Sequence, residues 1–369
     1  MTFDVEKNLS AALIGLEKID MRNMPVPELG PFDVLVNVKV TGICGSDVHF
    51  FKHNRILHLE VTEPLVLGHE SAGVVVAIGS QVTRVNVNDR VAIEPGVTCR
   101  TCEMCKSGQY NLCPHCKFAA TPPTHGTLCN YYVHPEDFIF KLPDDISLEE
   151  GALVEPLSVG MYAVERANVK PGDVVLVLGA GPVGLLTCAA AKAAGAAQVI
   201  IADLIPSRLE FAKTYATDTQ LLLDRPEKGE PNFEYARRTS TQIIQKLGQQ
   251  ADTVLDCTGA ETCVQMAVLL TKSGGSAVLV GLGATTQTLP VVDITVRQVN
   301  VKGVFRYCNV SPVSIVRAYP RAISMLTKGN IDVKPLITHT YPIEKSQEAL
   351  LHATNGSDGA IKIQVINDQ

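Results

Sequence analysis

A chain of 369 residues is too long for one ordinary domain and suits two. Hydrophobic residues make up 46% of it and charged residues 19%, which is typical of a globular protein with a full core. The formal net charge of −6 argues against a nucleic-acid partner, because phosphate binding needs a basic surface. No apolar run is long enough to span a bilayer, and residues 1–7 lack a signal pattern, so we expect a cytoplasmic protein with no membrane partner.

The cysteine content is high for such a protein. Eleven cysteines occur, and four of them lie between Cys99 and Cys113. Because we expect no export signal, metal-binding thiolates and buried free thiols are favoured over disulfides.

Residues 1–157 are predicted to form a β-rich, barrel-like body with a separate lobe at 95–116. Short β-branched or alternating runs are interrupted by glycine and proline, as in strands that are joined by loops. The clearest runs lie at 34–40, 73–78 and 89–93.

Strands and helices alternate from residue 158 to residue 298. After a short helix at 157–164, strands are predicted at 174–178, 198–202, 221–223, 253–256 and 277–280, with helices at 183–194 and 234–247. This alternation indicates the α/β class, with a doubly wound parallel sheet of the Rossmann type and helices on both faces.

The last segment, 299–369, is expected to return to the first body. A strand is predicted at 299–303, a helix at 314–327 and a closing strand at 360–365. The β-rich domain is therefore expected to be discontinuous, with the dinucleotide domain at 158–298 inserted into it.

A glycine-rich turn follows the strand at 174–178 directly. It reads Gly179-Ala-Gly181-Pro182-Val183-Gly184 and opens the Ala-rich helix. The first glycine of such a turn permits a tight bend, the second lets the backbone approach a pyrophosphate, and the third lets helix and strand pack closely. The N–H groups at the helix N-terminus then face the phosphates. The flanking strand and helix favour a dinucleotide site over a glycine turn of another kind.

An acidic residue stands where the adenosine ribose is expected. Asp203 ends the next predicted strand, and a carboxylate there binds ribose hydroxyls and repels a 2′-phosphate. This predicts NAD as the cofactor. Arg208 is close enough in sequence to stack on the adenine.

The four clustered cysteines have the spacing of a metal site. Cys99, Cys102, Cys105 and Cys113 follow the pattern C-x2-C-x2-C-x7-C. Four thiolates suit a closed, tetrahedral zinc site of the structural kind. An iron–sulfur cluster is the competing hypothesis, although the ferredoxin pattern places its last cysteine three residues on rather than at this longer spacing. Cys116 is an alternative fourth ligand.

A second set of metal ligands lies upstream. Cys44, His69 and Glu70 offer a thiolate, an imidazole and a carboxylate, and three protein ligands leave one zinc position open, as catalysis requires. Each residue alone would more often be an ordinary buried or surface side chain. Their occurrence beside a dinucleotide turn favours the catalytic interpretation.

Taken together, these motifs resemble those of the zinc-containing medium-chain dehydrogenase/reductase superfamily. The pattern Gly68-His-Glu-x2-Gly-x5-Gly, the cysteine lobe and the glycine turn occur in order along the chain. Four further stretches are similar to the polyol dehydrogenase branch, which includes the sorbitol, xylitol and L-arabinitol enzymes: 44–49, 125–129, 155–160 and 303–309.

The resemblance implies a GroES-like catalytic domain, NAD, one catalytic and one structural zinc per subunit, a small polyol substrate and a homo-tetramer. It implies that Cys44, His69 and Glu70 hold the catalytic zinc, with Glu155 at the metal either as a ligand or through its water. Ser46 and His49 are candidate proton relays. The resemblance also places Val280, Gly281, Leu282, Val304, Phe305 and Arg306 beside the nicotinamide, and Arg306 and Tyr307 on the substrate hydroxyls.

One residue departs from the animal sorbitol enzymes. Those enzymes tend to have tyrosine after the histidine of the Cys-Gly-Ser-Asp loop, and here the residue is Phe50, as in the L-arabinitol enzymes. Phe50 is expected to contact the substrate or to serve as an apolar pocket wall. The substitution moves the expected substrate from sorbitol alone toward pentitols.

Three rival functions stay open on the sequence alone. The same scaffold suits a dehydrogenase for a simple alcohol, formaldehyde or threonine. The cysteine lobe also resembles a zinc-ribbon binding module, although Arg100 and Lys106 are its only basic residues. An inactive structural protein is the third, and the intact ligand set argues against it.

Overall fold

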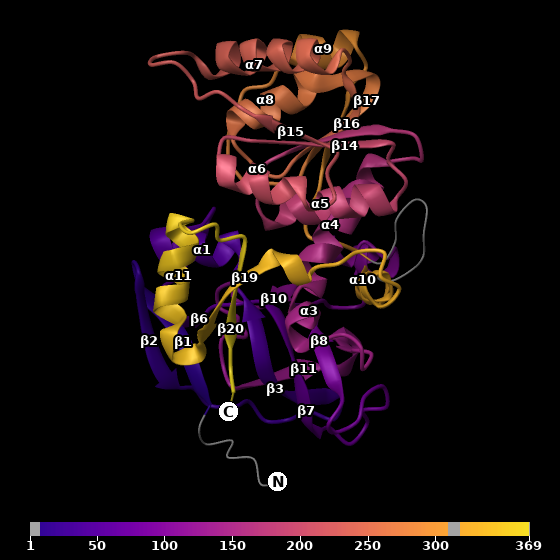
Figure 1. Cartoon of the computed structure of the whole chain (residues 1–369). Coiled ribbons are helices and arrows are strands. Elements are labelled where there is room, and N and C mark those ends of the chain that lie inside the picture. Colours follow the sequence, from indigo (N-terminus) through magenta and orange to yellow (C-terminus); the bar gives the residue numbers. More distant parts are fainter. Residues whose placement is uncertain (1–7, 309–317, 369) are drawn as a thin grey trace. The chain divides into compact units, whose positions relative to one another are not determined.

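The chain divides into two compact units in a computed structural model that describes residues 8–308 and 318–368 (Figure 1). Unit 1 comprises Met1–Glu155 and Tyr319–Gln369, and unit 2 comprises Pro156–Ala318. The β-rich domain is therefore discontinuous, as expected.

Unit 1 is built around a sheet whose central strands are mostly antiparallel. The strands of this sheet are β3 (Asp33–Gly42), β7 (Glu70–Ile78), β8 (Arg90–Ile93), β11 (Tyr131–Pro135), β12 (Ile139–Lys141), β19 (Ile337–Pro342) and β20 (Lys362–Ile366). They lie in the order β12-β8-β7-β3-β20-β19, and β11 also pairs with β3. The closing strand β20 runs antiparallel to β3, so the end of the chain lies next to an early strand.

Shorter elements of unit 1 surround this sheet. Its other strands are β1 (Leu9–Gly15), β2 (Lys18–Asn23), β4 (Arg55–Ile56), β5 (Leu59–Glu60), β6 (Leu65–Val66), β9 (Gly96–Val97) and β10 (Lys117–Phe118). Its helices are α1 (Gly45–His53), α2 (Glu103–Lys106), α3 (Leu148–Ala152), α10 (Ala318–Thr327) and α11 (Ser346–Asn355). Four 3-10 turns complete the part of unit 1 that the structure describes: η1 (Tyr110–Leu112), η2 (Glu136–Phe138), η3 (Lys334–Leu336) and η4 (Ile343–Lys345).

The strand β3 shows why this segment forms a sheet. Its alternate residues Val34, Val36 and Val38 are buried in one apolar cluster with residues of β7, β8 and β12. β-Branched side chains at alternate positions fit a pleated strand that buries one face. A separate apolar cluster contains Phe50 and Phe51 of α1 and Leu350 of α11.

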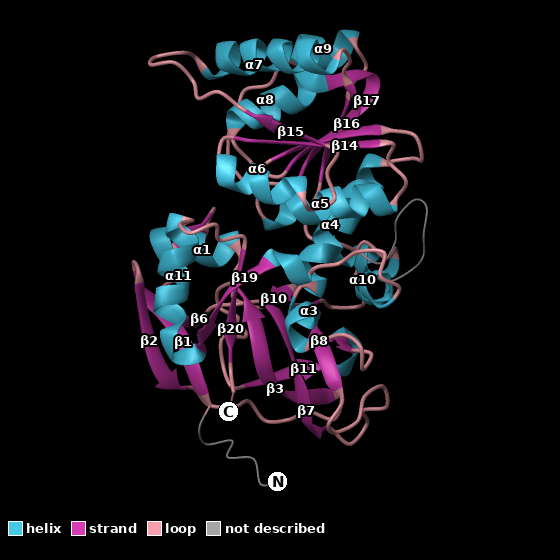
Figure 2. Cartoon of the chain, in the orientation of Figure 1, coloured by secondary structure: helices cyan, strands magenta, loops and turns pink. Residues whose placement is uncertain are grey.

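Unit 2 is a parallel sheet with helices on both faces (Figure 2). Its strands are β13 (Val174–Leu178), β14 (Gln198–Asp203), β15 (Thr219–Leu222), β16 (Ala251–Asp256), β17 (Thr271–Leu279) and β18 (Asn300–Gly303). They lie in the order β15-β14-β13-β16-β17-β18, and every neighbouring pair is parallel. The helices are α4 (Val154–Ala167), α5 (Pro182–Ala193), α6 (Pro206–Lys213), α7 (Asn232–Leu247), α8 (Glu261–Leu270) and α9 (Val291–Val296).

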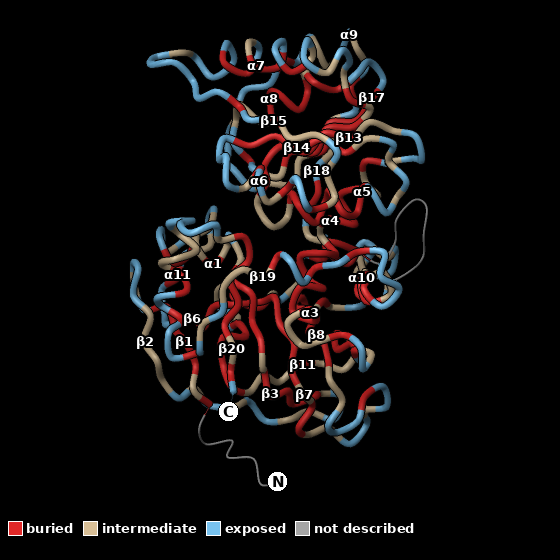
Figure 3. Tube along the Cα trace, in the orientation of Figure 1, coloured by how far each residue is buried: buried red, intermediate tan, exposed pale blue. Residues whose placement is uncertain are grey.

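The strands β13 and β14 are almost wholly buried, as Figure 3 shows in red. Their near-continuous apolar sequences are typical of a parallel sheet covered on both faces. The expected Rossmann class, doubly wound, is therefore confirmed.

The expected boundary at residues 298 and 299 differs from the division of the structure into its two units. The strand β18 pairs in parallel with β17 from Ser276↔Asn300 to Leu279↔Gly303, so unit 2 continues to Ala318. The sequence of a four-residue strand does not indicate which sheet the strand joins. The expected helix at 314–327 is described only from Ala318, because 314–317 lie outside the described residues.

Within the described ranges 8–308 and 318–368, no helix combines the length and apolar character needed to cross a membrane.

Candidate functional site

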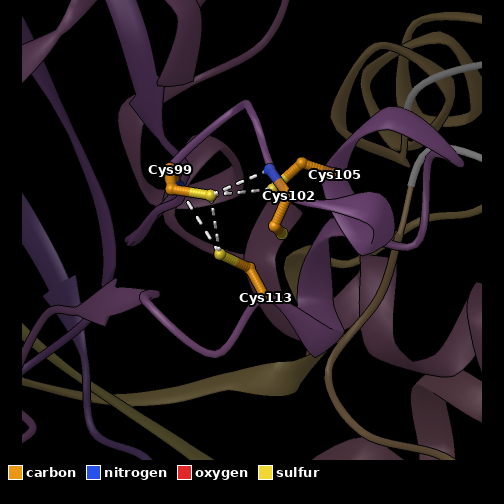
Figure 4. A group of neighbouring side chains, drawn as sticks. All are labelled: Cys99, Cys102, Cys105 and Cys113. Carbon is orange, nitrogen blue, oxygen red and sulfur yellow. Dashed lines mark hydrogen bonds between the residues drawn. The ribbon is translucent and has the colours of Figure 1, made fainter.

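The four clustered cysteines converge on one point in the lobe of unit 1 (Figure 4). The Sγ atom of Cys99 lies 3.9 Å from that of Cys105 and 3.6 Å from that of Cys113. In a tetrahedron with zinc–sulfur bonds of 2.3 Å, two sulfurs are about 3.8 Å apart. The donor set thus fits one zinc ion, and Cys113 rather than Cys116 completes the group.

Backbone N–H groups of this lobe donate to cysteine sulfurs and so favour the charged form that binds a cation. The N–H of Cys102 donates to Sγ of Cys99 at 3.3 Å, and the N–H of Cys99 faces Sγ of Cys113 at 3.5 Å. Hydrogen bonds from the backbone of Cys102 and Thr101 lower the pKa of the Cys99 thiol to about 5. A thiolate is the form that binds a metal.

Two polar contacts fasten the lobe to the body of unit 1. Arg100 donates to both carboxylate oxygens of Asp137, at 2.6 and 2.8 Å. The hydroxyl of Tyr110 donates to the buried carboxylate of Glu94, which follows β8 directly. The lobe is therefore held at a fixed place in unit 1 by a bidentate ion pair and a buried hydrogen bond.

A second group of metal donors lies where β3, α1 and β7 meet. Cys44 stands at the N-terminal cap of α1, His69 precedes β7, and Glu70 is the first residue of that strand. One ligand atom from each residue lies within 4.8 Å of the others, and His69 and Glu70 are 6% and 1% exposed. Thiolate, imidazole and carboxylate are all zinc ligands, so this donor set also fits a zinc ion.

Asp47 organises this second group, although no pattern in the sequence indicates such a role. Its Oδ2 accepts the N–H of Cys44 and its Oδ1 accepts the N–H of Gly68, both at 2.9 Å. The same Oδ1 lies 3.6 Å from Nδ1 of His69, which leaves Nε2 available for a metal. A carboxylate behind a metal-binding histidine fixes the orientation of the ring.

The charges of this group affect one another. Burial raises the pKa of Asp47, but nearby His69 and the backbone donors outweigh it and hold that pKa below its ordinary value. Burial lowers the pKa of His69, but the negative groups Asp47 and Cys44 outweigh it, so that pKa lies well above its ordinary value. The site therefore attracts positive charge, as a cation site requires.

Two more residues without a signal in the sequence lie at this group. The buried Lys362 of β20 donates to both carboxylate oxygens of Glu70. Phe118 of β10 lies beside His69, with the ring centroids 5.4 Å apart. Neither residue is near the ligands in sequence, so only the fold brings them together.

The other expected site residues of unit 1 differ in how far they are buried and in which element holds them. Ser46 is half-buried and His49 is exposed on α1, and Nδ1 of His49 lies 2.8 Å from the carbonyl oxygen of Arg55. Glu155 is 5% exposed at the start of α4. Phe50 is 3% exposed and packs in the apolar cluster of α1 and α11, which weighs against the expected substrate contact.

The glycine turn in unit 2 has the shape that a dinucleotide needs. Gly179 has a φ of +98°, which side chains rarely adopt, and a Cβ on Gly184 would lie 1.8 Å from the carbonyl oxygen of Gly179. A Cβ on Gly181 would meet no atom within 4 Å, so packing does not require glycine there. Open space beside Gly181 fits the approach of a pyrophosphate. Gly181 caps α5, with Pro182 and Val183 in its first turn.

Asp203 ends β14 beside this turn. Its Oδ2 accepts the N–H of Ala180 at 2.6 Å and its Oδ1 accepts the N–H of Ile205 at 2.8 Å. Arg208 is half-buried on α6. The acid is thus held at the carboxyl end of the sheet, where cofactors bind in this class of fold.

The segments expected beside the nicotinamide also follow strands of this sheet. Val280 and Gly281 come after β17 and donate to the carbonyl oxygen of Asp256, whereas Leu282 is 68% exposed. Val304 and Tyr307 are buried after β18, and Phe305 is 43% exposed. Arg306 has a φ of 54°, and its guanidinium lies 4.5 Å from the centroid of the Phe305 ring.

Two family models match the chain, one within unit 1 and one mainly in unit 2. Residues 30–144 match an alcohol dehydrogenase GroES-like domain, and residues 182–328 match a zinc-binding dehydrogenase. The chain belongs to the zinc-binding dehydrogenase family. Membership of this family confirms that the chain is an enzyme of the oxidoreductase class, and it implies zinc and a nicotinamide cofactor.

Members of this family with similar sequences are found in animals and fungi. The chain is 47% identical to sorbitol dehydrogenase of Mus musculus over 350 residues, which is 95% of this chain and 94% of that one. It is 46% identical to probable D-xylulose reductase A of Aspergillus niger over 344 residues, 93% of this chain and 92% of the relative.

Solved structures of two dehydrogenases agree with the fold. An oxidoreductase/dehydrogenase of unknown specificity from Escherichia coli is 34% identical and superposes with a TM-score of 0.88, covering 98% of this chain and 100% of that one. The 2R,3R-butanediol dehydrogenase of Bacillus subtilis is 28% identical with a TM-score of 0.83, covering 98% and 99%.

Proposed function

We propose that this chain is a zinc-dependent polyol dehydrogenase. It oxidises a secondary hydroxyl of sorbitol, xylitol or L-arabinitol to the ketose and transfers a hydride to NAD. The observation that carries the proposal is the group of Cys44, His69 and Glu70 in a chain that is 47% identical to a sorbitol dehydrogenase over 95% of its length. The similarity to a probable D-xylulose reductase supports a pentitol among the substrates.

Cys44, His69 and Glu70 hold the catalytic zinc in this proposal, and the four lobe cysteines hold a structural one. When bound, a zinc ion with an open position supplies Lewis acidity that lowers the pKa of an alcohol hydroxyl. The protein's part is to fix the donors, which Asp47 does through the N–H groups of Cys44 and Gly68.

Ser46 and His49 carry the substrate proton away. A proton on Nδ1 of His49 is donated to the carbonyl oxygen of Arg55 at 2.8 Å, which leaves Nε2 as the proton acceptor. His49 is exposed, so the proton passes from there to solvent. The buried carboxylate of Glu155 accepts a hydrogen bond from the substrate or from water at the metal.

The glycine turn, Asp203 and Arg208 hold the adenosine half of NAD. The segments 280–282 and 304–306 hold the nicotinamide, and Arg306 and Tyr307 bind the remaining substrate hydroxyls. Asp203 favours NAD over NADP because its carboxylate repels a 2′-phosphate.

A panel of substrates tests the proposal directly. NAD reduction is measured with sorbitol, xylitol, L-arabinitol, ribitol, ethanol and threonine, with NADP in place of NAD as a control. We expect turnover of the polyols with NAD and little of ethanol or threonine. Cys44→Ser and His69→Ala should abolish turnover and leave NAD binding intact. Full activity in either variant would show that Cys44, His69 and Glu70 do not form a catalytic metal centre.

A second candidate is a dehydrogenase for a smaller alcohol on the same scaffold. The similarity to 2R,3R-butanediol dehydrogenase favours it. Preference for ethanol, a diol or threonine in the same panel would replace the polyol proposal.

The proposal includes a homo-tetramer in the cytoplasm. Exposed apolar residues on α9 support self-association, namely Val291, Val292 and Val296 at 62%, 74% and 72% exposure. Light scattering tests the subunit count, and cell fractionation tests the location.

A further inference from the structure

A buried lysine from the last strand reaches the candidate catalytic metal group. Lys362 begins β20 and is 2% exposed. Its Nζ lies 2.9 Å from Oε1 and 2.6 Å from Oε2 of Glu70, and 3.0 Å from the carbonyl oxygen of Ile43. An ammonium group has three donors, so these contacts use all of them.

The register of three strands makes this contact possible. Gly42 of β3 lies opposite Glu70 of β7, and β20 pairs with the other edge of β3. A Cβ on Gly42 would lie 2.3 Å from Oε2 of Glu70. The missing side chain thus lets the carboxylate of Glu70 extend across β3 to a lysine on the strand beyond.

The charges at this place are unbalanced without the lysine. Two carboxylates beside the metal donors are buried, those of Asp47 and Glu70, at 0% and 1% exposure, and the negative charge of Glu155, which is 5% exposed, also acts on Lys362. Buried charges need partners, because removal from water is costly. Replacing a buried ion pair by apolar groups is often neutral or stabilising, so global stability alone does not explain why both charges are present.

A carboxylate that is fixed by hydrogen bonds is a better metal ligand than a free one. Each oxygen of Glu70 that accepts from Lys362 keeps a second lone pair, so the carboxylate can bind a cation without losing the lysine. Loss of such an outer partner typically lowers metal affinity or activity by about 10- to 100-fold.

We propose that Lys362 is a positioning residue that holds the Glu70 carboxylate toward Cys44 and His69, so that docking of the C-terminal strand and metal binding reinforce each other. This inference rests on the proposed metal centre. It assigns to the last strand a role in the site that the zinc ligands alone do not reveal.

Zinc affinity tests the inference separately from activity. Zinc per chain is measured by elemental analysis after titration with a competing chelator, for the full-length protein and for Lys362→Met. We expect the catalytic zinc to bind about 10- to 100-fold more weakly in the variant, while the lobe zinc is retained. Lys345→Met, a change at an exposed lysine that pairs with Glu348 in the same unit, is the control and should leave both zincs unchanged.

A double-mutant cycle separates positioning from a general structural effect. If Lys362 acts through Glu70, then Lys362→Met should change zinc affinity by less than about twofold in a Glu70→Gln background. A further large loss there would overturn the inference, as would unchanged affinity in Lys362→Met alone. If that single variant does not fold, the comparison of Glu70→Gln with the double variant still decides, since neither leaves an ionised Glu70 without a partner.

The result also distinguishes the inference from the proposed function. If the wild type turns over polyols and Lys362→Met has unchanged zinc affinity, the proposed function is supported and the positioning role of Lys362 is excluded. Failure of the wild type to bind a zinc outside the lobe would remove both.

Discussion

The backbone N–H of Ala180 in the glycine turn donates to the carboxylate of Asp203 across a distance of 2.6 Å. This bond joins the ends of β13 and β14, which are neighbours in the parallel sheet. The acid that is expected to select the cofactor is therefore fixed by the turn that is expected to bind the pyrophosphate. Phosphate binding and ribose recognition depend on one local structure.

Asp203→Ala should weaken the use of NAD and reduce discrimination against NADP. A hydrogen bond to a charged group contributes about 1.5–3 kcal/mol, which corresponds to a loss of roughly 10- to 150-fold in kcat/KM for NAD. The measurement is kcat/KM with each cofactor at a saturating polyol concentration. Glu227→Gln, in the exposed loop after β15, is the matched control. An unchanged ratio of NAD to NADP use would show that Asp203 does not select the cofactor.

Asp47→Asn should weaken the catalytic metal group without touching a ligand. The amide keeps one acceptor oxygen, so one of the backbone donors at Cys44 and Gly68 loses its partner, and the negative charge behind His69 disappears. We expect zinc affinity or turnover to fall by about 10- to 100-fold. Chelator competition measures it, with Glu60→Gln at an exposed site of unit 1 as the control. Equal affinity in Asp47→Asn would mean that the backbone alone orients the ligands.

Two variants of the cysteine lobe decide whether Cys113 or Cys116 is the fourth ligand of its zinc. Cys113→Ser should remove the lobe zinc and lower the melting temperature, because a structural zinc contributes folding free energy. Cys116→Ser should retain that zinc, since the group that converges includes Cys113 and not Cys116. Elemental analysis and thermal unfolding of both variants check this. The opposite pattern would make Cys116 the fourth ligand.

Much of the candidate site could be predicted from the spacing of residues within short stretches of the sequence. The four lobe cysteines span 99 to 113, and the glycine turn lies between one strand and one helix, so short-range geometry brings each set together. Repeated apolar runs also predicted the parallel sheet, although α6 and α8 went unrecognised because short helices between strands give a weak periodic signal.

Long-range relationships could not be predicted in this way. Lys362 is 292 residues from Glu70 in sequence, and only the pairing of β20 with β3 brings them together. Likewise, nothing adjacent to Phe50 in the sequence indicates that its side chain packs in one apolar cluster with Leu350 of α11. Such contacts depend on strand order, which composition and spacing do not encode.

Stability of unit 1 should depend on pH through His134. This residue is 2% exposed, its Nε2 donates to the carbonyl oxygen of Glu94 at 2.8 Å, and burial lowers its pKa to about 4. An unfolded histidine has a pKa of about 6.5, so the unfolded chain binds the extra proton first as pH falls. The stabilisation is fully present above pH 6.5 and is lost toward pH 4, by about 3 kcal/mol at most.

His134→Gln keeps a donor for Glu94 and removes the titration. The free energy of unfolding, measured in urea between pH 6.5 and pH 4, should therefore fall less steeply in this variant than in the wild type. His58→Gln, at an exposed histidine, should follow the wild type. Parallel curves for His134→Gln and the wild type would exclude this group as the source.

Charge on α9 should break the proposed assembly. Val292 and Val296 are 74% and 72% exposed, and β18, which follows this helix, lies at the edge of the unit 2 sheet. Exposed apolar side chains that gather on one helix are typical of a surface that is covered by another chain. In a closed symmetric assembly each copy carries the substitution, so a single change disrupts every copy of that interface.

Val292→Lys/Val296→Lys should reduce the mass measured by light scattering and leave the fold of the single chain intact. Leu16→Lys/Phe32→Lys, at 59% and 53% exposed sites of unit 1, should leave that mass unchanged, and the reverse result would move the interface to unit 1.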